Sequence, residues 1–426
     1  MENEERVDQD KDHHNKERKN ELSIYQINRS FLNNLEGLRL FVDNLIPVAT
    51  KHDITQAVKV KKYAEKITKK LDKLEESVKK QNMEAGILQV KIDEIKFDFI
   101  KNIFYSPILT TSNIELLYKS SFVMLLTYFD FLIADLIRYY FKLYPETLSE
   151  KAKDLSISLS DLKQCKDILE AESFIVSKEV DKVLYNKNLN DQKKYFENYL
   201  KVDCKTHIVN WSKINEAMER RHIIVHNNSM VYRRYMQNID SSKINDGKGG
   251  VKEGQQIKVE PNYFKATFDE LFIAGVILTQ CCWRKWDKVN IDICDSELNI
   301  TIYDKLVQER WAVAEKLGLF AKECELSNDS YRLTLAINYA QSLKWQNKKD
   351  ELENELKGID ISTLSPRYIV GIAALRDDRE GFYKNINKVV STNEMTVKDF
   401  MEWPLFREFR KDADYQRRIK SAFSTN

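Results

Sequence analysis

Turn-forming residues are scarce in this chain: its 426 residues include only 11 Gly and 6 Pro. Sandwiches, propellers and collagen-like repeats all need frequent Gly and Pro. The chain is instead rich in Lys, Glu, Leu and Ile. We therefore predict an all-α protein, and the length allows two or three domains.

Charge and composition exclude several classes of protein. The 68 basic and 66 acidic residues nearly cancel, so any nucleic-acid contact must come from a local patch. No apolar run approaches the roughly 18–20 residues of a membrane span, and the polar first 20 residues lack the apolar core of a secretory signal. The 6 Cys show no disulfide-scaffold spacing. These features predict a cytoplasmic protein with reduced thiols and no membrane partner.

The first residues of the chain divide into a tail and a helix. Residues 1–20 are almost wholly charged or polar and are predicted to be a disordered tail. An amphipathic helix is predicted from Leu22 to about Leu45, where Pro47 should end it.

A heptad pattern then follows and predicts that residues 21–110 form a helical or coiled-coil arm. Apolar or small residues recur at alternating steps of four and three: Val60, Ala64, Ile67, Leu71, Leu74, Val78, Gln81, Ala85, Leu88, Ile92, Ile95 and Phe99. The arm is either one long helix used for dimerisation or sensing, or an antiparallel hairpin that turns near Asn82–Gly86.

Two further helical domains are expected, over 111–290 and 295–426. In the first, the apolar stretch 120–146 predicts a buried helix, and its acids Asp130 and Asp135 must be paired there. In the second, a weak internal repeat predicts two-helix hairpins with roughly the period of tetratricopeptide units. Leu343, Leu352 and Leu356 recur there as Leu375, Phe382 and Ile386.

The segment around residue 221 carries the residues best suited to chemistry. Arg221 falls on a helical stripe with Ile214, Met218 and Val225, where a core residue is expected, so it must be paired, line a cleft or meet another subunit. His222 and His226 stand at i and i+4 spacing on a neighbouring face. Polar residues end the helix, followed by an aromatic and basic cluster: Asn227, Asn228, Ser229, Tyr232, Arg233 and Arg234.

The sequence RHIIVH, with Arg221 as the arginine, His222 as the polar residue and His226 as the histidine, resembles the signature of the HEPN superfamily of helical bundles. The following VHNNSMV-x-x-x-Y and the earlier SFVMLLTYFDFLIADLIRYY are also similar to bacterial members. The resemblance covers about residues 113–286.

The resemblance implies metal-independent RNA cleavage without a cofactor, in which a ribose 2′-hydroxyl attacks the adjacent phosphodiester. Histidine can move protons at neutral pH, and the arginine fork can hold phosphate oxygens. Residues five apart on a helix diverge by about 140°, so the site is expected to be shared by two copies of the chain. The expected catalytic residues are Arg221, His226 and His222. Asp130, Asp135 and Asn227 are expected to support them, and Arg220, Tyr232, Arg233 and Arg234 to contact RNA.

Other interpretations of these residues remain open. Arg221 can be a structural cation neutralised by Asp130 or Asp135, with His226 capping the helix end. Cys204, His207, His222 and His226 also have a spacing that zinc sites use. The cluster of Tyr232, Arg233 and Arg234 is equally compatible with half-buried helix packing and solvated arginines.

Motifs of other enzyme classes are missing from the sequence. It has no Walker lysine loop, no GxGxxG, no nucleophile elbow and no paired acids at metal-site spacing. Those enzyme classes therefore lack support. The resemblance implies an endoribonuclease, with antiphage defence or toxin-like growth arrest as its setting and a regulatory protein or antitoxin to restrain it. The rival hypothesis is a non-catalytic helical scaffold that binds RNA, a nucleotide or a protein partner.

Overall fold

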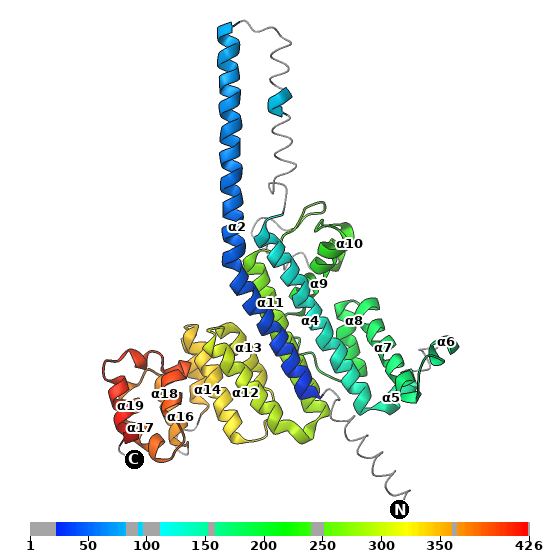
Figure 1. The fold of residues 1–426 in the computed structure, drawn as a ribbon. Helices are drawn as coiled ribbons and strands as arrows, with labels where there is room; N and C mark the ends of the chain where they lie inside the picture. The colour runs from blue at the N-terminus through cyan, green and yellow to red at the C-terminus, as the bar shows by residue number, and fades with distance from the viewer. Residues whose placement is uncertain are drawn as a thin grey trace, which may run out of the picture. The chain divides into compact units, whose positions relative to one another are not determined.

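The computed structural model describes residues 23–81, 93–96, 111–151, 158–239, 251–359 and 364–424. Helices make up most of these residues (Figure 1), and the only β-type pairing among them is an isolated bridge between Met230 and Gln256. The prediction of an all-α protein is confirmed. The predicted disordered tail, residues 1–20, lies outside the described residues.

The chain divides into two compact units that interleave along the sequence. Unit 1 comprises the described residues of Met1–Ser30 together with Phe131–Trp211 and Asp269–Asn426, and unit 2 comprises Phe31–Asp130 and Ser212–Phe268. This division differs from the predicted one, because residues 111–290 contribute to both units.

Helices α2, α4, α9, α10 and α11 carry most of the described residues of unit 2. Parts of α2, α4 and α11, and the first residue of α9, belong to unit 1. The bounds of the five helices are α2 Ile24–Gln81, α4 Asn113–Leu143, α9 Trp211–His226, α10 Arg233–Asn238 and α11 Pro261–Trp286. Aromatic contacts join α4 to α11: the ring centroids of Tyr118 and Phe264 lie 5.6 Å apart, and those of Phe122 and Tyr263 lie 5.7 Å apart.

Helix α2 continues through Pro47, so the prediction that this proline ends the first helix is wrong. Pro47 is exposed, and water can therefore hydrate the Asp43 carbonyl that has no helical donor. Beyond it, the Asp53 carboxylate accepts bonds from the backbone N–H groups of Asn113 (2.9 Å) and Ile114 (3.0 Å). Desolvation disfavours the charge of Asp53, but a bond from the Asn113 side chain, together with these backbone bonds, lowers its pKa below the ordinary value. Asp53 thus caps the start of α4.

The predicted heptad pattern lies partly on α2 and partly outside the described residues. Along α2, Val60 and Ile67 are half-buried, while Ala64 and Leu71 are exposed. Residues 82–92 and 97–110 are outside the described ranges, and the choice between one long helix and a hairpin falls on them.

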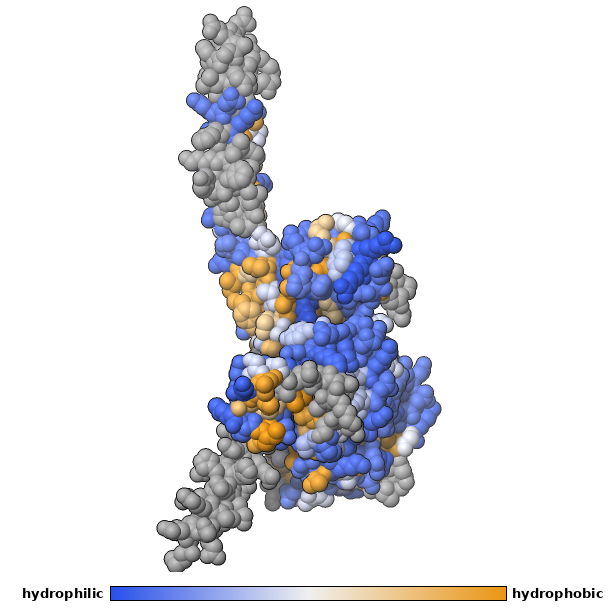
Figure 2. Space-filling view, turned by 90° about the vertical axis from the view of Figure 1, so that its right-hand side faces the viewer, coloured by the Kyte–Doolittle hydropathy of each residue, from blue (hydrophilic) through white to orange (hydrophobic). Residues whose placement is uncertain are grey.

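Helices α4 and α11 are long and apolar enough to cross a membrane by length and composition, contrary to the prediction that the chain has no such run. Within the protein, 56% of the most apolar window of α4 and 78% of that of α11 are buried. Helix α4 nevertheless exposes Leu116 and Met124, so its predicted burial on all sides is only partly correct. The face drawn in Figure 2 is largely hydrophilic with separate hydrophobic patches. These features are consistent with core helices of a soluble protein.

Unit 1 contains the remaining helices. Before α11 these are α5 Pro145–Lys151, α6 Leu159–Leu162, α7 Ile168–Asn186, α8 Leu189–Lys194 and the π-helix η2 Tyr195–Tyr199. After it come η4 Lys288–Asn290, α12 Ile291–Val307, α13 Trp311–Lys322, α14 Asp329–Trp345, α15 Lys349–Lys357, α16 Pro366–Leu375, α17 Arg379–Ser391, α18 Val397–Glu402, η5 Pro404–Phe406, η6 Phe409–Lys411 and α19 Tyr415–Ser424.

Helices α12–α17 form successive hairpins that share one kind of turn. Glu309, Asn347 and Asp377 each adopt a positive φ of 57–59° directly after a helix. The next backbone N–H then bonds the carbonyl five residues earlier: Arg310 to Lys305 (2.9 Å), Lys348 to Leu343 (3.0 Å) and Asp378 to Ala373 (2.9 Å). Many helices end with a hydrogen bond of this kind, and the residue in the left-handed conformation is then usually a glycine. Here other residues take the left-handed position, which explains why so few glycines suffice.

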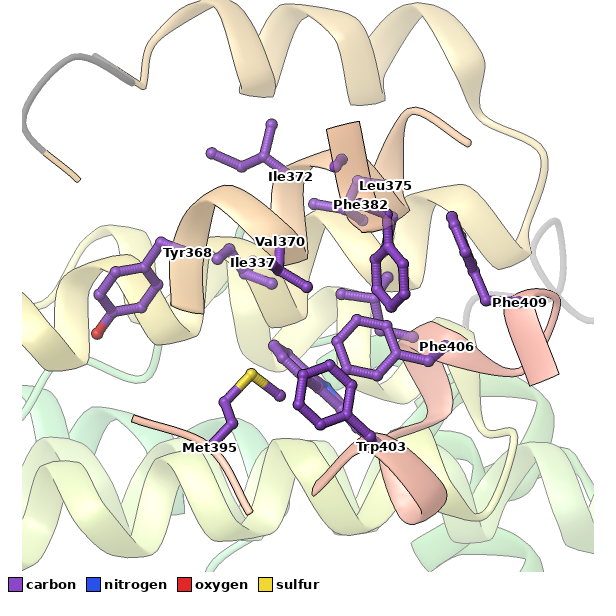
Figure 3. Packing of buried hydrophobic residues seen from close by; sticks show 14 of the residues in the cluster. Ile337, Tyr368, Val370, Ile372, Leu375, Phe382, Met395, Trp403, Phe406 and Phe409 are labelled. Carbon is purple, nitrogen blue, oxygen red and sulfur yellow. The ribbon is translucent and has the colours of Figure 1, made fainter. Parts of the chain in front are cut away.

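The residues of the predicted repeat all lie in one hydrophobic cluster. They are Leu343, Leu352, Leu356, Leu375, Phe382 and Ile386. Figure 3 shows Phe382 among the aromatic side chains of this cluster, and its ring centroid lies 4.3 Å from that of Phe409 and 5.1 Å from that of Phe406. Helical hairpins are therefore present in this region, whereas the tetratricopeptide class remains a prediction.

Candidate functional site

Helix α9 presents one buried face and one accessible face within unit 2. Its buried residues include Ile214, Ala217, Arg220 and Ile223. The predicted core stripe is correct at Ile214, whereas at Met218 and Arg221 the buried residue is one position earlier. An arginine does occupy a core position, but it is Arg220, whereas Arg221 is only partly buried and Val225 is 54% exposed.

Arg220 is held in a buried polar network. Its Nε donates to Glu216 Oε1 over 2.7 Å, its Nη1 donates to the Lys258 carbonyl over 2.8 Å, and its guanidinium lies 3.8 Å from the centroid of the Tyr263 ring. The hydroxyls of Tyr235 and Tyr263 also donate to Glu216. Arg220 is only 2% exposed, so its predicted RNA contact is wrong. Burial opposes the charge of Arg220, but the neighbouring tyrosines and Glu216 raise its pKa further above its ordinary value.

Arg221 points to helix α4, where its Nη1 donates to Asp130 Oδ2. The predicted pairing with Asp130 is therefore present. Both side chains are partly accessible, at 30% for Arg221 and 23% for Asp130. Burial raises the pKa of Asp130, and the Arg221 charge partly offsets that effect. Asp135 forms an ion pair with Arg138 on its own helix over 3.0 Å, and its supporting role in the site stays a prediction.

His222 and His226 lie side by side on the accessible face of α9. Both are exposed, and their ring centroids are 4.8 Å apart. Partial burial lowers the pKa of His222, and the neighbouring His226, Arg234 and Arg221 lower it further, against the opposing effect of Glu219. These effects favour the neutral form of His222, which can accept a proton.

The turn after His226 is fixed by local hydrogen bonds. Asn227 donates its Nδ2 to the Met230 carbonyl over 2.7 Å, and the Ser229 N–H bonds the Ile223 carbonyl over 2.9 Å. Asn228 and Ser229 take left-handed backbone conformations there, with φ of 45° and 64°. Asn227 therefore helps to shape the turn that ends α9, and its supporting role in the site stays a prediction.

A second segment packs behind this turn and holds it in place. The N–H of Val231 bonds the Gln255 carbonyl, and the N–H of Ile257 bonds the Ser229 carbonyl, each over 2.9 Å. Ile223, Val231 and Ile257 then share a small hydrophobic cluster. The segment around Gln255 and Ile257 therefore pairs with the chain that follows α9.

Tyr232, Arg233 and Arg234 extend the accessible surface beside the histidines. The Tyr232 ring centroid lies 6.4 Å from that of His222, and both arginines are exposed at the start of α10. Tyr232 also packs against the cluster of Ile223 and Val231. The surface can therefore offer positive charge and one aromatic ring next to two imidazoles.

The structure does not bring together the four residues of the zinc alternative. Cys204 is buried, and burial raises the pKa of its thiol to about 12. The Nε2 of His207 lies 2.5 Å from Glu323 Oε1 in unit 1, whereas His222 and His226 belong to unit 2. Across the described ranges, no group of three or more His, Cys, Asp or Glu side chains could hold a metal ion.

Comparison of the chain with family models, with curated proteins and with solved structures found no match. The site is therefore defined by its own geometry: a partly accessible Arg221–Asp130 ion pair, and an exposed His222–His226 pair with arginines beside it.

One part of the site region is not predictable from the sequence. The network around Arg220 depends on Tyr235 and Tyr263, which are distant from it in sequence. The available signal is the i, i+4 spacing of Glu216 and Arg220, which is equally typical of a surface ion pair.

Proposed function

We propose that this protein is a metal-independent endoribonuclease of the HEPN type, and that α9 carries its active site. The observation that carries the proposal is the exposed pair of imidazoles, His222 and His226, on the helix that also presents Arg221. Imidazoles transfer protons near neutral pH, and a guanidinium fork suits a phosphodiester.

The proposed reaction is a transesterification within the RNA strand. His226 accepts the proton of a ribose 2′-hydroxyl, and the 2′-oxygen forms a bond to phosphorus while the bond from phosphorus to the 5′-oxygen breaks. A second imidazole, in its protonated form, donates a proton to the 5′-oxygen as that bond breaks. The products are a 2′,3′-cyclic phosphate and a 5′-hydroxyl. His222, whose lowered pKa favours its neutral form, stands beside His226 as an alternative acceptor.

Arg221 stabilises the charge that develops on the phosphate oxygens. Asp130 engages the Nη1 of Arg221, and a guanidinium has five N–H donors. Donors therefore remain for a phosphate while the ion pair holds the side chain in one orientation. Asp130 is thus a positioning residue in this mechanism.

The site is completed by a second copy of the chain. Arg221 is directed to α4 and His226 lies at the end of α9, so one copy spreads these groups apart. Two copies facing one another across α9 supply the second imidazole. RNA and the chain itself are thus the proposed partners, in the cytoplasm, with antiphage defence or toxin-like growth arrest under a regulatory protein or antitoxin as the setting.

A second candidate function is favoured by the Arg221–Asp130 pair. An arginine neutralised by a carboxylate is also what a structural cation requires. In that case the bundle is a non-catalytic scaffold that binds RNA, a nucleotide or a protein partner, and the exposed His222 and His226 carry no chemistry.

Incubation of total cellular RNA with wild-type protein and with His226→Ala, in excess EDTA, separates the two candidates. Because the 2′-hydroxyl is the nucleophile, the nuclease should cleave without added metal, and His226→Ala should lose cleavage with unchanged helical content. Cleavage that disappears in EDTA, or that survives in His226→Ala, contradicts the proposed mechanism. Intact RNA with both proteins favours the scaffold.

A further inference from the structure

Beyond Pro47, helix α2 carries lysines on several sides, and four of them line one side of the helix. Lys59, Lys62, Lys66 and Lys69 fall within an arc of about 80° when residues are placed 100° apart around the helix. The apolar residues of the heptad pattern, Val60, Ala64, Ile67 and Leu71, centre about 150° from that arc. Glu65 and Asp72 lie on the remaining side. We call Lys59, Lys62, Lys66 and Lys69 the lysine face.

The lysine face is accessible and uncompensated. All of its side chains are exposed. Within the described residues, no carboxylate lies in ion-pair contact with them, although α2 forms such pairs elsewhere, as between Arg39 and Asp43. Like charges at these spacings repel and weaken a helix slightly. The chain as a whole carries a net charge of only +2, so this local concentration of charge is not a consequence of a basic composition.

The spacing of the lysine face suits a polyanion with regularly repeated charges. Successive lysines are separated by three, four and three residues, which corresponds to rises of about 4.5 to 6 Å along the helix axis. The face from Lys59 to Lys69 is therefore about 15 Å long. Flexible lysine side chains on such a line can contact consecutive phosphates of one nucleic-acid strand.

The arrangement of the faces disfavours a lipid surface as the ligand. A helix that lies in a membrane interface buries its apolar face, and the lysines that contact headgroups flank that face. Here the lysine face points nearly opposite to Val60, Ala64, Ile67 and Leu71, so the two cannot contact one surface together. The lysine face also stays accessible when the apolar side pairs with another helix.

We propose that the lysine face of α2 is a binding surface for the phosphate backbone of single-stranded RNA, which recruits substrate without reading its sequence. This inference rests on the proposed ribonuclease function for the identity of the polyanion. It adds a binding surface on α2 to the basic residues that follow His226, and it places the main salt-dependent contacts on Lys59, Lys62, Lys66 and Lys69.

The test measures RNA binding against salt concentration. The probe is a fluorescently labelled oligouridylate that has no secondary structure, and the protein carries His226→Ala so that the probe stays intact. In this background, Lys59, Lys62, Lys66 and Lys69 are all replaced by Gln, which keeps the exposed helix favourable. For a single strand, each lysine that no longer neutralises a phosphate reduces the steepness of log K against log salt by about 0.7. The steepness should therefore fall by about 3 when all of the lysine face is replaced.

A matched control removes the same charge elsewhere. Lys349, Lys357, Lys388 and Lys420 are exposed lysines of unit 1, and their joint replacement by Gln should leave the slope unchanged. A parent-like slope in the α2 variant overturns the proposal, as does an equal fall in the control, which would indicate only net charge. Binding to phosphatidylserine vesicles is measured with the same proteins. If the α2 variant loses vesicle binding but keeps RNA binding, the proposal is also overturned, in favour of a lipid surface.

The same proteins distinguish failure of this inference from failure of the proposed function. If wild-type protein cleaves RNA but the α2 variant keeps the parental slope, the RNA surface on α2 is wrong and the nuclease stands. If the slope falls as expected but wild-type protein leaves RNA intact, the binding surface stands and the nuclease is wrong.

Discussion

Replacement of Arg220 by Ala should strongly destabilise the protein. Replacement of the adjacent Arg221 by Ala should have a much smaller effect. The guanidinium of Arg220 is the cationic partner of Glu216, which is only 4% exposed, and it also satisfies the Lys258 carbonyl. The variant therefore leaves a buried carboxylate held only by tyrosine hydroxyls, together with a cavity beside the Tyr263 ring.

The magnitude follows from the burial of the pair. Removal of one partner of a buried ion pair costs about 3–5 kcal/mol, because the remaining charge stays desolvated. Arg221→Ala is the matched control. Its pair with Asp130 is partly accessible, at 30% and 23%, and a screened pair of this kind contributes about 1 kcal/mol or less. The two neighbouring substitutions should thus differ by about 2 kcal/mol or more.

Urea unfolding followed by far-UV circular dichroism measures both free energies. A third variant, Glu216→Gln with Arg220→Met, removes both charges but keeps an acceptor for the tyrosines. It should recover much of the stability that Arg220→Ala loses, because replacing both members of a buried pair is often near neutral. Equal stability of Arg220→Ala and Arg221→Ala, or a double variant less stable than Arg220→Ala, would refute this account of the network.

The remaining predictions concern the site itself. Arg221→Lys should lose most RNA cleavage in a kinetic assay while keeping its fold, because a point charge cannot replace the fork; full activity would leave Arg221 a structural cation. Since the pKa of His222 is lower in the folded protein than in the unfolded chain, the unfolded chain binds more protons as the pH falls through about 6.5, and stability decreases there. His222→Gln should remove that part of the pH dependence in urea titrations from pH 7.5 to about 5.5, and an unchanged profile would contradict the assignment. Wild-type chains mixed with His226→Ala chains should lose much more than half of the activity after subunit exchange; activity strictly proportional to the wild-type fraction would exclude a shared site.

The fold is predictable where local chemistry decides it. The scarcity of Gly and Pro indicates helices, and the apolar stretch 120–146 locates α4. The effect of Pro47 is not predictable in this way. It depends on whether water can reach the Asp43 carbonyl, which has no helical donor, and water can do so because Pro47 is exposed. The turns at Asn347 and Asp377 are hidden in the sequence because residues other than Gly take the left-handed conformation there.

The site is predictable to within one residue on α9. Steps of three and four are nearly equivalent around a helix, so the sequence pattern places Arg221 in the core stripe that Arg220 occupies. The pairing of Arg221 with Asp130 is correctly predicted, because an acid inside an apolar helix requires a partner. Asp135 cannot be separated from Asp130 in this way, since its partner Arg138 lies on its own helix.

The most direct test of the central claim is the chemistry of the cleaved ends. A defined RNA oligonucleotide is incubated with wild-type protein in EDTA, and the products are analysed by mass spectrometry, with His226→Ala as the control. The proposed reaction predicts a 5′ fragment that ends in a 2′,3′-cyclic phosphate or its opened form, a 3′ fragment that begins with a 5′-hydroxyl, and neither product from His226→Ala. Fragments with 5′-phosphate and 3′-hydroxyl ends would show that water is the nucleophile, and they would contradict the assignment of Arg221 and His226 to a transesterification.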